Sequence, residues 1–148
     1  MEEFVHKVCS RLGEKVRLLD RFAMATARIK DGLADEESRQ ISRHVKERQT
    51  IIHRIEAIDR ELDRLKRENS MSVRMLSEKA KDLIGDYLVR TRMSLESASE
   101  VDGECLMSAQ DECSSVRSDI LQIRSGLRMA RGYGRTRIKT PRFLDLKR

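Results

Sequence analysis

Apolar side chains recur at steps of three and four over most of the chain, which is the period of an amphipathic α-helix. Lys30-Asp31-Gly32 places a cation and a glycine at the end of the first such stripe, where both favour helix termination. The sequence therefore predicts a first helix that ends near Gly32. Its apolar stripe consists of Val5, Val8, Leu12, Val16, Leu19, Phe22, Thr26, Ile29 and Leu33.

A second helix is predicted between the acidic segment 35–38 and Asn69-Ser70. Opposite charges three and four residues apart support its exposed face. A rod of roughly 33 residues is about 50 Å long and cannot fold onto itself, so it needs partner helices. Its aliphatic residues form a strict heptad seam of Ile51, Ile55, Ile58, Leu62 and Leu65, which Ile41 and Arg48 extend backwards.

A third helical segment is predicted from about Ser72 to Arg131. Leu88 and Met93-Ser94-Leu95 shift its register and Asp102-Gly103 is a weak breaker, so one long helix and a kinked or divided one fit equally well. The first stripe consists of Leu76, Ala80, Leu83 and Tyr87, and the second of Ala98, Val101, Cys105, Ala109, Cys113, Val116, Ile120, Ile123 and Leu127. The fold class is therefore predicted as all-α, an elongated antiparallel bundle of three or four long helices over residues 1–131.

Residues 132–148 are predicted to form a flexible basic tail, because Gly132-Tyr133-Gly134 should end the helix and no periodicity follows. The segment from Arg128 to Arg148 holds eight Lys/Arg and one Asp, a balance of +7, whereas the whole chain carries +6. Residues 1–127 therefore carry −1, and the whole positive excess lies at the C-terminal end.

Composition supports exposed helices and excludes several other classes. Charged residues make up 38% and aromatic residues 3%, which favours long helices over a sheet. The chain has no run of 18 apolar residues and begins with an acidic segment, so we expect neither a membrane span nor a signal peptide. The cysteines are odd in number and lack CxxC spacing, which predicts free thiols in the cytoplasm.

The sequence has no pattern typical of catalysis or metal binding. His6, His44 and His53 lack a partner at ligand or triad spacing, and the cysteines of the third segment lie among aliphatic residues at helical spacing. Gly132-Tyr133-Gly134 follows a helix and lacks the Lys-Ser/Thr of a phosphate loop. We therefore expect no enzyme, no metal, no cofactor and no small-molecule substrate.

Three interpretations remain open. The basic tail could bind nucleic acid through salt-sensitive phosphate contacts, but it holds one Tyr and one Phe and the body offers no reading motif. The heptad seam of the second helix could make a structural coiled coil, although it lasts only about three repeats and does not explain the tail. A chaperone or adaptor could hold an amphipathic client helix against a soft apolar face, and we favour this interpretation.

A client surface is predicted on the third segment, which is much longer than the second helix and should leave part of its apolar face without an internal partner. The alternative, that this face packs on the first two helices, is equally compatible with the pattern. The candidate client-binding residues are Val101, Cys105, Ala109, Cys113, Val116, Ile120 and Ile123.

Several stretches resemble FlgN-type flagellar export chaperones. KERQTIIHRIEAIDRELDRL (46–65) is similar to the second helix of that family, and SEVDGECLMSAQDECSSVRSDILQIRSGLRMA (99–130) is similar to its long final helix. Gly-Tyr-Gly before a polar tail and the closing PRFLDLKR also resemble the ends of family members. The resemblance covers nearly the whole chain in the same order.

The resemblance implies a cytoplasmic, ATP-free chaperone. Such a protein binds the amphipathic C-terminal helices of hook-associated proteins, which form the hook–filament junction, and delivers them to the flagellar type III export gate. It implies that Tyr133 is the aromatic anchor of a gate-docking tail. Arg135 and Arg137 would steer that tail to an acidic partner, and Phe143 and Leu144 offer a second apolar anchor. The client and the oligomeric state stay open.

Overall fold

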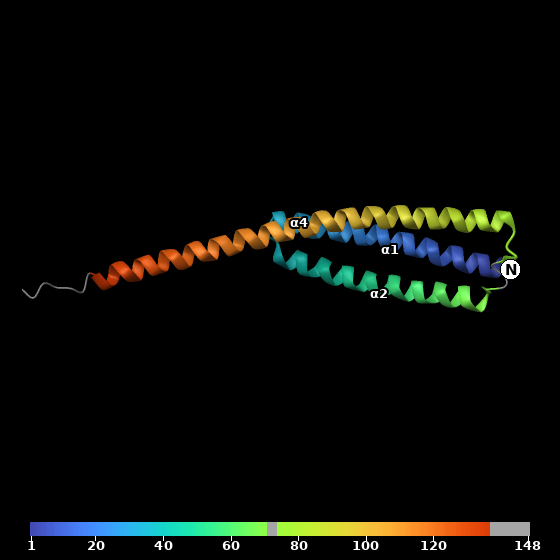
Figure 1. Ribbon diagram of the computed structural model, residues 1–148, viewed down its shortest axis with the longest axis horizontal. Helices are drawn as coiled ribbons and strands as arrows, with labels where there is room; N and C mark the ends of the chain where they lie inside the picture. The colour runs from blue at the N-terminus through green and yellow to red at the C-terminus, as the bar shows by residue number, and fades with distance from the viewer. Residues whose placement is uncertain (71–73, 137–148) are drawn as a thin grey trace, which may run out of the picture. The chain divides into compact units, whose positions relative to one another are not determined.

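Three long α-helices make up the regular structure of the residues described. The computed structural model describes residues 1–70 and 74–136. α1 spans Glu2–Ala34, α2 spans Ser38–Glu68 and α4 spans Glu78–Thr136 (Figure 1). Every regular element in these two ranges is helical, which confirms the all-α prediction.

The chain divides into two compact units, Met1–Ala109 and Gln110–Arg148. Unit 1 contains α1, α2 and the part of α4 up to Ala109, and unit 2 contains the rest of α4. The predicted boundary lay after Arg131, at a different position from this division.

Interhelical ion pairs define how α1 and α2 run within unit 1. Arg11 Nε lies 2.9 Å from a carboxylate oxygen of Glu61, and Arg21 Nη2 lies 3.5 Å from one of Glu47. The residue further along α1 thus pairs with the residue that comes earlier in α2. The two helices are therefore antiparallel, and they lie side by side in Figure 1.

The first part of α4 runs parallel to α1. A Cβ atom at Gly13 would lie 3.4 Å from Tyr87 Cε1, and Lys30 Nζ lies 2.6 Å from a Glu104 oxygen. Here both residue numbers rise together. Each helix of unit 1 is thus antiparallel to the one before it in the chain, and at position 13 a Cβ atom would just touch the Tyr87 ring of α4.

The core of unit 1 uses the predicted seam of the second helix. Ile51 and Ile58 on α2 are 2% and 4% exposed, and they form a buried cluster with Leu18 of α1. The half-buried residues packed against this cluster are Phe22, Ile55 and Leu62. Since this seam is buried between helices of the same chain, it is a bundle core.

Arg48 is a charged residue at a seam position, and its guanidinium has partners on both neighbouring helices. Its guanidinium lies 4.5 Å above the centroid of the Phe22 ring, and its Nη2 donates a hydrogen bond of 2.7 Å to Asp102. Cation–π contact and a carboxylate together replace the water that the guanidinium loses. Arg48 thereby links α1, α2 and α4 within unit 1.

The stripe of α4 that faces the bundle differs from the prediction in two ways: one predicted residue is exposed, and the stripe is not interrupted. Leu83 was assigned to the stripe, but it is 47% exposed, and Ile84 takes the inward position. No shift of register occurs around residues 88–95, because Thr91 and Ser94 continue the inward face. Thr91 can be buried because its hydroxyl donates a hydrogen bond of 2.8 Å to the carbonyl of Tyr87.

The helix ends agree with the sequence pattern to within a few residues. α1 ends at Ala34, close to the predicted end near Gly32, and the chain turns at Glu36, whose φ of 57° is left-handed. The N–H of Glu37 bonds back to the carbonyl of Gly32 over 3.0 Å, as in a Schellman motif. α2 ends at Glu68, which confirms the predicted stop at Asn69-Ser70.

α4 begins and ends later than predicted. It starts at Glu78, not near Ser72, and it is one continuous helix of 59 residues rather than a divided one. The prediction that Gly132-Tyr133-Gly134 ends the helix is wrong, because α4 continues to Thr136. Glycine inside a helix costs only about 1 kcal/mol relative to alanine, which lowers helix stability without forcing termination.

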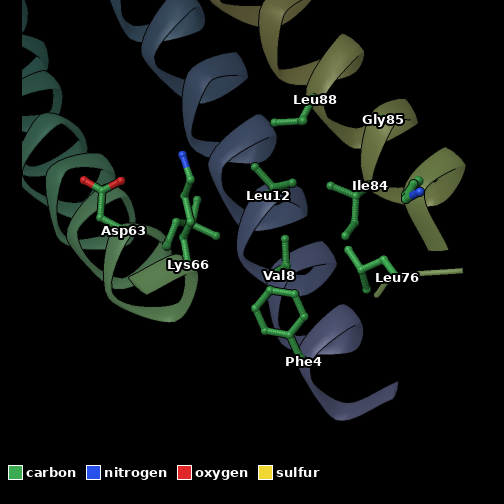
Figure 2. A pocket seen from close by; sticks show the side chains of 11 residues that line it. Phe4, Val8, Leu12, Asp63, Lys66, Leu76, Ile84, Gly85 and Leu88 are labelled. Atoms are coloured by element: carbon green, nitrogen blue, oxygen red, sulfur yellow. The ribbon is translucent and has the colours of Figure 1, made fainter. Parts of the chain in front are cut away.

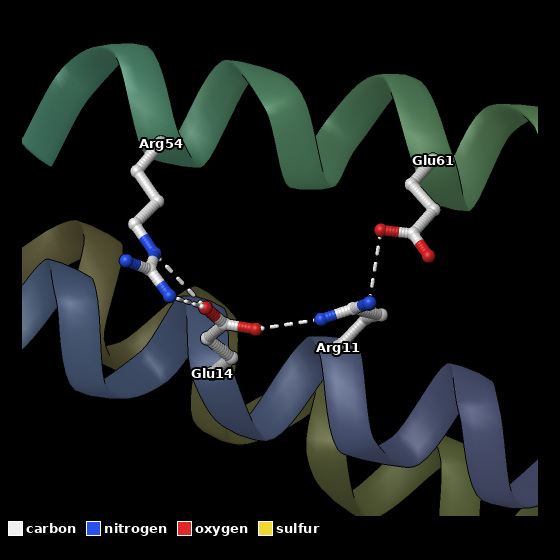
Figure 3. A network of polar contacts seen from close by, with 4 residues as sticks. All are labelled: Arg11, Glu14, Arg54 and Glu61. Carbon is white, nitrogen blue, oxygen red and sulfur yellow. Dashed lines mark hydrogen bonds and ion pairs between the residues drawn. The ribbon is translucent and has the colours of Figure 1, made fainter.

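A four-residue polar cluster ties α1 to α2 (Figure 3). Arg54 donates to Glu14 through Nη2 at 2.8 Å and Nε at 3.0 Å, and Arg11 donates to the other Glu14 oxygen at 2.9 Å. Arg11 also reaches Glu61. The hydrogen bonds from Arg54 and then Arg11 lower the pKa of Glu14 below its ordinary value.

We expect Glu14→Gln to lower the free energy of unfolding by about 1 kcal/mol at neutral pH, because a charge-assisted network loses its central carboxylate. A carboxylate with a lowered folded-state pKa stabilises the protein above its unfolded pKa, and this contribution is lost as the pH falls through the folded value. Urea denaturation at several pH values should therefore show the two proteins converging in acid. Glu96→Gln, at an exposed pair with Arg92, is the control and should change stability little; a Glu14 effect independent of pH would contradict the assignment.

Candidate functional site

An exposed apolar stripe runs along the part of α4 that belongs to unit 2. Among its aliphatic side chains, Ile120 is 45% exposed, Val116 48%, Leu127 53% and Ile123 63%. Contiguous exposed apolar surface usually marks an interaction site. We define the unit 2 seam as Cys113, Val116, Ile120, Ile123, Leu127 and Ala130.

The seam has a different register from the stripe that packs inside unit 1. Val101, Cys105 and Ser108 follow one another at steps of four and three and face the bundle. If this heptad continued into unit 2, the positions on the same face would be occupied by polar residues or glycine, namely Ser115, Asp119, Gln122 and Gly126. The apolar residues come one position later. The sequence of unit 2 therefore encodes an apolar face of its own.

Charged residues of opposite sign border the two sides of the seam. Arg117, Arg124 and Arg131 follow the seam residues on one side, and Glu112 and Asp119 precede them on the other. Within the described part of the chain, none of these five side chains forms an ion pair. A shallow surface depression on this stretch is lined by Glu112, Cys113, Val116, Arg117, Ile120, Leu121 and Arg124.

The structure divides the predicted client-binding residues between the two units. Val101 and Ala109 are half-buried and Cys105 is 5% exposed, all within unit 1. Burial raises the pKa of the Cys105 thiol, so this sulfur is a packed side chain and a poor nucleophile. The other four, Cys113, Val116, Ile120 and Ile123, are exposed and share the unit 2 seam. Leu127 belongs with them, although the prediction omitted it from the site.

The predicted gate-docking residues lie only partly within the structure. Tyr133 is in the last turns of α4 with 78% of its surface exposed. Arg135 is also part of α4, close to its end at Thr136. Arg137, Phe143 and Leu144 lie outside the described residues.

A second apolar surface, which the sequence pattern did not predict, lies in unit 1 (Figure 2). It is a pocket of about 550 Å³ with apolar walls, to which all three helices contribute. Its polar lining residues are Asp63, Lys66 and Lys81. The pocket joins three segments far apart in sequence, so no local pattern could reveal it. The apolar lining residues are Phe4, Val8, Leu12, Leu62, Leu76, Ile84, Gly85 and Leu88.

The described residues contain neither a cluster of metal ligands nor a helix able to span a membrane. Over residues 1–70 and 74–136, no group of three His, Cys, Asp or Glu side chains is placed to hold a metal ion. Within the same ranges, no helix is both long and apolar enough to cross a bilayer.

No protein-family model, curated protein or solved structure matches the chain.

Proposed function

We propose that the protein is a cytoplasmic export chaperone of the FlgN type, which holds an amphipathic C-terminal helix of a hook-associated protein and delivers it to the flagellar type III export gate. The observation that carries the proposal is the unit 2 seam. Its aliphatic residues are about half exposed and are spaced as one side of a helix–helix contact. The resemblance of residues 46–65 and 99–130 to that family points the same way.

Helix–helix binding suits this seam physically. Each aliphatic side chain that becomes fully buried contributes about 1.5–3 kcal/mol, from which the cost of ordering the client must be subtracted. In the family that the chain resembles, the client segments are amphipathic helices that associate with one another in the filament. Covering such a face with the seam would keep a client from premature assembly and would need no ATP.

A saturating client helix should raise the melting temperature of the full-length chaperone. A ligand that binds only the folded state stabilises it by about 2.7 kcal/mol at a free concentration a hundredfold above the dissociation constant. The probe is a synthetic C-terminal helix from a hook-associated protein, followed by circular dichroism. A peptide of the same composition, with its helical periodicity scrambled, is the control. If the saturating native peptide leaves the melting temperature at the value of the scrambled one, the chaperone proposal fails.

We extend the proposal to gate docking through the C-terminal basic segment, with Tyr133 as the anchor and its neighbouring cations as an electrostatic guide. The 78% exposure of the Tyr133 side chain supports this role. Tyr133→Ala should reduce client secretion and gate binding while client affinity stays near normal. Under the nucleic-acid alternative the outcome differs: deletion of residues 132–148 abolishes salt-dependent retention on DNA or RNA, and Tyr133→Ala has little effect.

A further inference from the structure

The unit 2 seam and its charged borders together follow the heptad pattern of a coiled coil. The core a positions are Cys113, Ile120 and Leu127, and the core d positions are Val116, Ile123 and Ala130. The flanking e positions are Arg117, Arg124 and Arg131, and the flanking g positions are Glu112, Asp119 and Gly126. In coiled coils, residues at e and g decide which helices pair and in which direction.

The charge pattern is complementary to itself when two copies run parallel. In a parallel pair, a g residue faces the e residue of the next heptad on the other helix. Glu112 would then face Arg117 of the second copy, and Asp119 would face Arg124, with both contacts repeated by symmetry. An antiparallel pair sets e against e and g against g, which opposes arginine to arginine and acid to acid. The pattern therefore selects the parallel arrangement.

The side chains that would make these contacts are available. Arg117, Asp119 and Arg124 are exposed, and with Glu112 they form no ion pair within the residues described. The aliphatic residues between them have about half or more of their surface exposed. Within residues 110–133, neither the apolar strip nor the bordering charges thus contact the partner that this pattern requires.

We propose that the unit 2 seam pairs in parallel and in register with the same seam of a second copy of this chain. The pairing does not depend on the chaperone function. If the proposed function holds, the second copy covers the seam until a client helix displaces it, and that exchange step alone rests on the proposed function.

Charge exchange between two variants tests the pairing in the full-length chain without any client. The first variant carries Arg117→Glu and Arg124→Glu, so that acid faces acid in both g–e contacts. The second carries Glu112→Arg and Asp119→Arg, so both borders are basic. Sedimentation velocity should show that the wild type self-associates, that each variant alone does so on the order of tenfold more weakly, and that an equimolar mixture recovers association. The proposal would be overturned if the wild type stayed monomeric at all concentrations, or if each variant measured alone associated as strongly as the wild type.

Disulfide formation tests the direction and register. Parallel pairing in register places the two Cys113 thiols side by side at a core position, within reach of a disulfide. In a chain with Cys9→Ala and Cys105→Ala, oxidised glutathione should convert most of the protein into a covalent dimer. The control combines these changes with Cys113→Ser and Ser118→Cys, which moves the thiol to the outward f position and should cross-link poorly. Equal cross-linking at both positions would refute the register.

The two proposals fail in different ways. Loss of self-association in the charge and cysteine experiments leaves the client measurement untouched, because that measurement uses a peptide and a chain with the native seam. Failure of the client peptide leaves the self-pairing results untouched, because they contain no client. The native cysteines remain in the charge-exchange variants, so the pairing stays testable even if the alanine substitutions at Cys9 and Cys105 impair folding.

Discussion

Ile58→Ala should lower the free energy of unfolding by about 2–5 kcal/mol, because it leaves a cavity in the tightest part of the unit 1 core. Ile58 is 4% exposed and packs with Leu18 and Ile51. A thin three-helix bundle has a small total stability, so the melting temperature should fall on the order of 10–30 °C. Urea denaturation followed by circular dichroism measures the loss.

Ile120→Ala is the matched control, since it makes the same chemical change on a residue that is 45% exposed. At a protein concentration low enough to keep the chain monomeric, it should alter stability by less than about 0.5 kcal/mol. Comparable losses from the two substitutions would mean that Ile120 is a core residue. The unit 2 seam would then not be available to any partner.

Val116→Asp combined with Ile120→Asp should weaken binding of the client helix by about a hundredfold or more, while the helical signal persists. Two aliphatic contacts of about 1.5–3 kcal/mol each are lost, and two carboxylates would have to be desolvated in the interface. Fluorescence anisotropy of a labelled client peptide measures the affinity. Circular dichroism on the same samples reports the fold.

Ser118→Asp combined with Gln122→Asp is the matched control for this double variant. It adds two carboxylates one turn apart in the same stretch of α4, at exposed positions away from the seam. Client affinity should stay within a few-fold of the wild-type value. If both double variants bind equally well, the client surface lies elsewhere, and if only the seam variant unfolds, Val116 and Ile120 are structural.

Periodicity was sufficient to predict the helices, because each needs an apolar stripe that local sequence alone supplies. The seam of α2 is the clearest case: Ile51 and Ile58 were placed on one face, and both are buried there. The expected turn after Gly32 and the stop after Glu68 are also close to the observed ends. These features depend on short-range residue spacing and on capping chemistry.

Which residues of α4 are buried depends on packing between distant segments, which the apolar pattern does not contain. Thr91 and Ser94 lie on the inward face of α4, where small polar side chains fit close to neighbouring helices. The aliphatic residues alone therefore indicated a shift of register between residues 88 and 95. The helical spacing also placed Cys105 and Ile120 on one predicted client surface, although only Cys105 is buried. Which part of a long amphipathic helix has a partner depends on where the other helices end, which no local pattern contains.

We propose the seam of residues 113–130 as a helix-binding surface, and amide hydrogen exchange tests this role most directly. In dilute, monomeric protein, amides of residues 110–131 should exchange quickly, because a helix without packed neighbours is marginally stable. A saturating hook-associated client helix should slow their exchange strongly and leave α2 almost unchanged. Protection confined to the pocket residues around Phe4, Leu62 and Leu88, with residues 110–131 unaffected, would contradict the claim and assign binding to unit 1.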